Sequence, residues 1–157
     1  MLAPLLLTLV TQTPAPTTNQ SPPPALLATW KPAKPRDTEY VRYTRTEPDG
    51  SASAIFAFAQ VCDCQPPHAV ELFQQALSSV PGASVTHSEL TVCGFHGERV
   101  IVTGLADPTN AASNFEVLLF RKEPALYTLQ YVFRSAAPMP DAEQALATLC
   151  PGTTATT

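Results

Sequence analysis

The side chains most capable of metal binding or redox chemistry lie in one short stretch, VCDCQPPH, at residues 61–68. It places Cys62 and Cys64 one residue apart, and His68 follows four residues after the second cysteine. Thiolates and imidazoles are ligands for Zn²⁺ and copper, and a pair of thiols can also cycle between dithiol and disulfide. The stretch therefore raises three hypotheses: a metal site, a redox pair, or part of a structural disulfide framework.

The metal hypothesis gathers Cys62, Cys64 and His68, with Cys93 and His96 of the sequence CGFH as further ligands. The C-x-C spacing differs from the C-x2-C spacing of zinc fingers. An oxidising compartment also favours disulfides over free thiolates. We therefore predict no resident metal and no cofactor. Metal handling or thiol-redox chemistry by the first three residues stays as the alternative function.

If the chain is exported, its four cysteines indicate two disulfides, which can pair in three ways. Cys93 ends a predicted strand and Cys150 ends the last predicted helix, so the favoured pairing joins these two. It closes a loop of about 58 residues, which stabilises the fold by about 4 kcal/mol if the disulfide acts through chain entropy. This bond would fix the last helix to the sheet.

Cys62 and Cys64 form the second candidate pair. In a straight strand their side chains lie about 6.6 Å apart, at 3.3 Å of rise per residue, whereas a disulfide needs Cβ atoms about 3.8 Å apart. The pair can close only if the chain bends at Asp63, which the following Gln65-Pro66-Pro67 favours. Such a short ring would be strained and easily reduced. If the strand stays straight, at least one of the two cysteines pairs with Cys93 or Cys150, or stays free.

Motifs typical of catalysis are absent elsewhere in the sequence. It contains no nucleophile elbow, P-loop, Rossmann glycine run or H-E-x-x-H. His68 falls at a helix start, His87 on a strand and His96 in a hairpin turn, where histidines act mostly as surface or capping residues. We therefore predict that the chain is not an enzyme.

The first 35 residues are predicted to be a targeting segment and a linker. Residues 1–13 contain an apolar run too short for a membrane span but suited to a secretory signal, although no Lys or Arg precedes it. Residues 14–35 are rich in Pro and Thr, which keeps a chain extended. Trp30 is expected to fasten this linker to the domain. We predict an extracytoplasmic location, secreted, periplasmic or envelope-associated, with no membrane span beyond the first segment.

Composition indicates one globular domain. The 157 residues are 45% hydrophobic and 14% charged, and the net charge is −4. This balance excludes the basic footprint of a nucleic-acid-binding protein. From Thr46 to Glu98, both included, the sequence has six acidic residues and no Lys or Arg. This run is interpreted as ordinary solvated surface rather than as a docking face for a cationic partner.

Periodicity predicts an α+β domain over residues 36–151, followed by a disordered tail at 152–157. The sequence predicts about six strands, at 39–46, 54–61, 83–93, 98–105, 114–121 and 125–134. One helix follows Pro66-Pro67, and a second is capped by Asp141 with Gln144 in the capping-box position. Two buried faces are also predicted: Tyr127, Leu129, Tyr131 and Phe133 on the last strand, and Ala142, Ala145, Leu146 and Leu149 on the last helix. The architecture is an antiparallel sheet in the order ββαββββα, with two helices packed against it.

This order of elements, with TVCG (91–94), EVLLFRKEPALYTLQYVF (116–133) and PDAEQALATLC (140–150), resembles the Mog1/PsbP-like domains of exported bacterial proteins. A cystatin-like sheet is the rival, but the Gln-x-Val-x-Gly hairpin of those inhibitors is missing. Members of the Mog1/PsbP-like group act mainly as assembly or binding modules without a shared active site. The resemblance therefore implies a non-enzymatic extracytoplasmic domain that binds a protein or a cell-envelope component.

Overall fold

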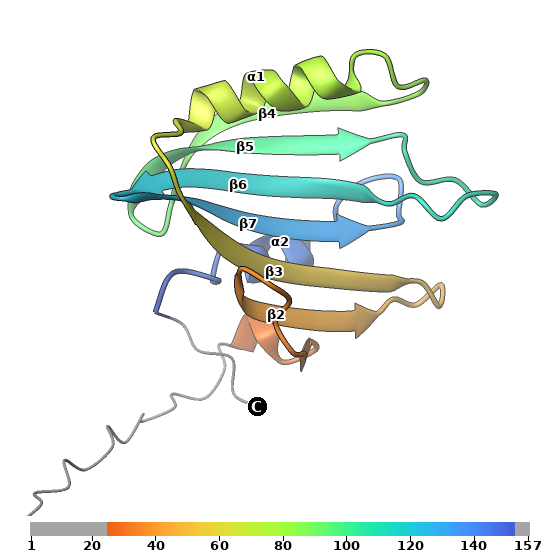
Figure 1. Cartoon of the computed structure of the whole chain (residues 1–157). Coiled ribbons are helices and arrows are strands. Elements are labelled where there is room, and N and C mark those ends of the chain that lie inside the picture. The colour runs from red at the N-terminus through yellow and green to blue at the C-terminus, as the bar shows by residue number, and fades with distance from the viewer. Residues whose placement is uncertain (1–24, 153–157) are drawn as a thin grey trace, which may run out of the picture.

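A computed structural model describes residues 25–152, which form one seven-stranded antiparallel sheet with helices on both faces (Figure 1). The strand order across the sheet is β1-β2-β3-β7-β6-β5-β4. The α+β class is confirmed, with seven strands in place of about six. In chain order the elements are η1 (Ala25–Leu27, a 3₁₀ helix), β1 (Lys31–Pro32), β2 (Glu39–Thr46), β3 (Ala52–Val61), α1 (Pro66–Leu77), β4 (Ser84–Val92), β5 (Phe95–Thr103), β6 (Asn114–Lys122), β7 (Ala125–Phe133) and α2 (Pro140–Leu146).

The additional strand lies in the stretch that the sequence assigns to the linker. Strand β1 pairs with β2 through Lys31 and Thr44, and Leu27 and Trp30 are each only 4% exposed. The guanidinium of Arg45 lies 4.2 Å from the Trp30 ring centroid. The packed part of the chain therefore begins before residue 36. The predicted signal segment, the first half of the linker and nearly all of the tail lie outside the described residues.

The hairpin between β4 and β5 is tighter than the four-residue GFHG link that the sequence predicts. Only Cys93 and Gly94 form the turn, with φ of 53° and 81°. Positive φ at both positions is what a two-residue hairpin of this twist requires. His96 therefore lies in β5 rather than in the turn. Gly97 follows it in the strand, where a Cβ atom would come within 2.2 Å of the Leu119 carbonyl oxygen.

Each face of the sheet carries its own apolar core. Helix α1 contacts β4, β5 and β6 on one face, while α2 contacts β3, β7 and η1 on the other. The predicted buried face of the last helix is confirmed, and of the predicted inward residues of β7 only Tyr127 is partly exposed. Fully buried residues on the α2 face include Ile55, Phe120, Leu129, Tyr131, Phe133, Ala142, Ala145, Leu146 and Leu149.

The two α-helices begin at prolines without a side-chain cap. Helix α1 starts at Pro66 and α2 at Pro140, and the N-cap residues Gln65 and Met139 make no side-chain capping bond. The predicted cap at Asp141 is therefore wrong: the helix begins one residue earlier, at Pro140, which already has the helical φ and has no N–H that would need an acceptor. Among residues 25–152, no helix is long and apolar enough to cross a membrane.

We expect Trp30→Ala to lower the free energy of unfolding by about 3 to 5 kcal/mol, because it empties a large buried site. Leu26→Ala is the matched control, since Leu26 is 42% exposed and an exposed truncation changes stability by about 0.5 kcal/mol or less. Urea unfolding followed by far-UV circular dichroism measures both variants. Equal stability of wild type and Trp30→Ala would show that residues 25–32 are not part of the folded unit.

Candidate functional site

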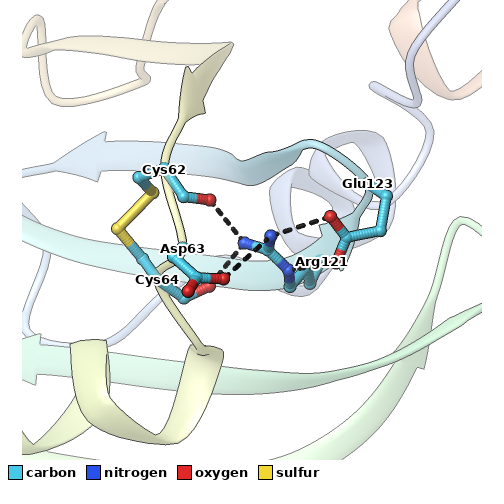
Figure 2. The surroundings of a disulfide bond; sticks show 5 residues. All are labelled: Cys62, Asp63, Cys64, Arg121 and Glu123. Atoms are coloured by element: carbon cyan, nitrogen blue, oxygen red, sulfur yellow. Dashed lines mark hydrogen bonds and ion pairs between the residues drawn. A yellow bond between two sulfur atoms is a disulfide. The ribbon is translucent and has the colours of Figure 1, made fainter.

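Cys62 and Cys64 form a disulfide at the corner between β3 and α1 (Figure 2). Their Cα atoms are 5.2 Å apart, closer than the roughly 6.6 Å that two residues span in a straight strand. The chain is bent at Cys62 and Asp63. The bend that the short ring requires is therefore present.

Arg121 on β6 holds this corner through backbone atoms (Figure 2). Its Nη1 donates to the carbonyl oxygens of Cys62 at 2.6 Å and of Cys64 at 2.9 Å. The other edge of the guanidinium donates to both oxygens of Glu123, at 2.7 and 2.9 Å. These hydrogen bonds lower the pKa of Glu123. Because Arg121 binds carbonyls rather than sulfur, it fixes the turn without engaging the disulfide itself.

The second disulfide joins Cys93, in the β4–β5 turn, to Cys150, which follows α2. The two Cα atoms are 5.5 Å apart, and the residues are separated by 57 positions in the chain. Nearby, the Tyr40 hydroxyl donates to the Leu149 carbonyl oxygen at 2.8 Å. The disulfide and this hydrogen bond both hold the chain segment after α2 against the sheet.

The ligands of the metal alternative are not brought together. All four sulfurs are in disulfides, and the His68 ring lies at the start of α1, with Nδ1 3.4 Å from Glu71 Oε2. His87 on β4 lies 3.9 Å from Glu98 Oε2. Within residues 25–152, no group of three or more His, Cys, Asp or Glu side chains is placed to hold a metal ion.

The structure instead brings three charged residues together in a hollow on the α2 face. The hollow has a volume of about 330 Å³ and lies between α2 and strands β4, β5 and β6. Arg99 comes from β5, Glu116 from β6 and Glu143 from α2. The remaining lining is mostly apolar: Leu90, Leu118, Pro140, Gln144 and Ala147.

Glu116 is the deepest of the three charges, at 2% exposure, against about 30% for the side chains of the other two. Its Oε1 accepts from Arg99 Nε at 2.7 Å, and Arg99 Nη2 donates to Oε1 of Glu143. No N–H or O–H donor among the described residues reaches Glu116 Oε2. Arg99 thus bridges two carboxylates and leaves one buried oxygen without a donor.

Burial raises the pKa of Glu116 to about 7, since the charged form is separated from water. The hydrogen bond and positive charge of Arg99 act in the opposite direction and are outweighed. Glu143 adds to the increase through its own charge and through a hydrogen bond that only a protonated carboxyl can donate. The carboxyl group therefore changes its protonation state near neutral pH.

Reasoning from the sequence missed this hollow, although it contained one signal. In EVLLF, Glu116 shares its strand face with Leu118 and Phe120, at a spacing of two. A charged residue in phase with core residues is unusual unless it is paired or functional. Neither Arg99 nor Glu143 carried a comparable signal, because each lies in a polar local context.

No protein-family profile and no curated protein matches the sequence. Among solved structures, the chain is similar to LpqN, a protein involved in cell envelope biogenesis of Mycobacterium tuberculosis. The TM-score is 0.47 and the sequence identity 16%, over 76% of this chain and 71% of LpqN. A likeness of this extent carries no information about function.

The two disulfides are expected to contribute unequally to stability. If each acts through the entropy of the unfolded chain, replacing Cys93 and Cys150 together with Ala costs about 4 kcal/mol, whereas replacing Cys62 and Cys64 costs about 1.6 kcal/mol. Guanidinium unfolding of the two double variants measures both values. A larger loss from the Cys62/Cys64 pair would contradict the entropic account.

We expect Glu116 to make stability depend on pH between about 4.5 and 7. Its pKa is about 7 in the folded protein against an ordinary 4.5, so the folded state binds this proton more tightly. The contribution is complete below about pH 4.5 and is lost as pH rises through 7. It amounts to about 3 kcal/mol. Thermal unfolding of wild type and Glu116→Gln across this range measures it, with the exposed Glu71→Gln as control. Parallel profiles for wild type and Glu116→Gln would contradict the pKa assignment.

Proposed function

We propose that this chain is a non-enzymatic extracytoplasmic domain that binds or assembles with a protein or another component of the cell envelope. The observation that carries the proposal is the Cys93–Cys150 disulfide. Structural disulfides persist in oxidising compartments outside the cytoplasm. This one also holds the segment after α2, and with it one wall of the hollow, against the sheet.

Binding rather than catalysis agrees with the lining of the hollow. Binding pockets are mostly apolar, with a few polar groups that fix orientation. The residues around Arg99, Glu116 and Glu143 are aliphatic apart from Gln144 and include no Ser, Thr, Cys, His or Lys. The hollow therefore lacks a nucleophile activated by an adjacent base. Arg99 also engages one oxygen of each carboxylate, which restrains both.

We extend the proposal to membership in the Mog1/PsbP-like group and to an amino-terminal secretory signal. The order of elements, and a sheet with two α-helices packed on it, support membership in this group. The apolar run within residues 1–13 supports the signal.

The location is tested by the state of the thiols in living cells. Cells that express the full chain are quenched with acid and alkylated, and the protein is then digested without reduction for mass spectrometry. We expect peptides linked 62–64 and 93–150, and free thiols in a control chain that lacks residues 1–13. Free thiols at all four positions of the full chain would contradict an extracytoplasmic location. A closed Cys93–Cys150 bond with free Cys62 and Cys64 would favour the thiol-redox alternative.

The binding role is tested by filling the hollow. Ala147 is exposed and lines it, so Ala147→Trp should block entry with little effect on folding. Ala76→Trp places the same side chain on the exposed side of α1, on the opposite face. We expect cross-linked envelope adducts of wild type to persist in Ala76→Trp and to disappear in Ala147→Trp. Unchanged adducts in Ala147→Trp would exclude the hollow as the binding surface.

A further inference from the structure

We infer that the hollow between α2 and the sheet is a binding site for an organic ammonium group carried on a short apolar stem, with Glu116 and Glu143 as its acceptors. This inference rests on the proposed binding function and specifies the chemistry of the ligand. It arises from one unusual feature, a carboxylate oxygen that is buried and has no donor.

The charge of the hollow selects a cation. Arg99 supplies one positive charge, while Glu116 and Glu143 supply two negative charges when both are ionised. Arg99 binds only Oε1 of each carboxylate. Once the proton that hydrogen-bonds Glu116 to Glu143 has left, the remaining carboxylate oxygens can accept from a further donor. An anionic ligand would compete with both carboxylates for Arg99 and would add to the negative charge of the hollow. An ammonium group has three N–H donors and no acceptor, which complements two carboxylate oxygens.

The apolar lining selects the stem. Leu90, Leu118, Pro140 and Ala147 surround the charged residues and offer aliphatic surface but no hydrogen-bonding side chain. A volume of about 330 Å³ accommodates a chain of a few methylene groups with its head group. Two sources share this chemistry: a free alkylamine, and the side chain of a lysine that a partner protein inserts.

The protonation state of Glu116 links binding to pH. The groups that act on it are Arg99 from β5 and Glu143 from α2, and Tyr131 lies opposite it on β7. Burial raises the pKa of the Tyr131 phenol, which stays neutral near pH 7. Without ligand, the proton on Glu116 relieves the excess negative charge. An ammonium group supplies the same positive charge to ionised Glu116. Because Glu116 is ionised mainly above pH 7, ammonium binding is expected to tighten as pH rises through 7.

The direct experiment titrates the full oxidised chain, labelled with ¹⁵N, with n-pentylammonium at pH 8 and records amide shifts. We expect saturable changes around residues 90, 99, 116 and 143. The uncharged isostere n-pentanol and the anion pentanoate should bind at least about tenfold more weakly, since each lacks the charge-assisted donor. Absence of saturable binding, or equal binding of n-pentanol, would overturn the inference.

Variants assign the acceptors. Glu116→Gln keeps the shape of the side chain and removes its charge, and we expect it to weaken n-pentylammonium binding about tenfold or more. Glu143→Gln is the second variant, and its more exposed position makes misfolding a lesser concern. Glu71→Gln on the opposite face is the matched control and should bind as wild type does. Equal affinity of wild type and Glu116→Gln, or an equal loss in Glu71→Gln, would overturn the assignment.

Measuring n-pentylammonium affinity as a function of pH distinguishes binding at this site from nonspecific attraction of a cation to an acidic protein. Since Glu116 must be ionised, affinity should rise about tenfold between pH 6 and pH 8, and Glu116→Gln should abolish the rise. A flat profile for wild type would overturn the role of Glu116. Nα-acetyl-lysine amide distinguishes the sources: binding of this probe supports a partner lysine, and its exclusion supports a free amine. If neither probe binds while Ala147→Trp still loses its envelope adducts, the ammonium inference fails and the proposed function stands.

Discussion

The docking of α2 on the sheet is the constraint on which the rest of this structure depends. With seven residues, Pro140–Leu146, the helix is too short to be stable alone. It is held by burial of its apolar face, by the Cys93–Cys150 bond that follows it, and by ion pairs from β2 and β5 to its first turn. Without α2, the apolar residues of β3 and β7 would face water, and Glu116 would lose the cover that perturbs it.

The two ion pairs that fix α2 have different consequences. Arg45 binds Asp141 at 2.6 Å at the exposed end and also covers the Trp30 ring at 4.2 Å, so it ties the helix to the amino-terminal segment. Arg99 binds Glu143 and reaches into the core to Glu116. Only the second arrangement buries a carboxylate. A buried charge that is incompletely hydrogen-bonded reduces stability. Such a group is a candidate for function, because strongly perturbed carboxyl groups gather at functional sites.

The two cysteine pairs play different structural roles, although both lie at chain reversals. Cys93–Cys150 spans 57 positions and connects elements that are distant in sequence. Cys62–Cys64 spans two positions and shapes a corner that Arg121 also holds through backbone carbonyls. Residues 61–68, which offered the most reactive side chains in the sequence, therefore form a turn. The described side chains there make no set of metal ligands. The more unusual chemistry lies on the opposite face.

By itself, the sequence determined the class of fold and most element boundaries. Alternation in residues 114–133 and the 3.6-residue spacing of Ala142, Ala145, Leu146 and Leu149 reflect which side of each element is buried, and burial is a local pattern. Proline, glycine and short polar links marked the turns for the same reason. Periodicity did not predict the packing of residues 25–32. Two isolated large apolar residues near prolines, Leu27 and Trp30, are too few to define a helical or strand repeat.

Only the tertiary structure decided which distant residues meet. Arg99, Glu116 and Glu143 come from three elements, and their meeting depends on strand register and on the position of α2. The same is true of the contact between Arg45 and Trp30, and of the hold that Arg121 on β6 has on the Cys62–Cys64 corner. The physical reason is that periodicity encodes the environment of one residue along its own element, whereas charge pairing and pKa depend on neighbours brought close by folding. Apart from the in-phase position of Glu116 among core residues, the candidate site of this protein belongs to that second kind of information.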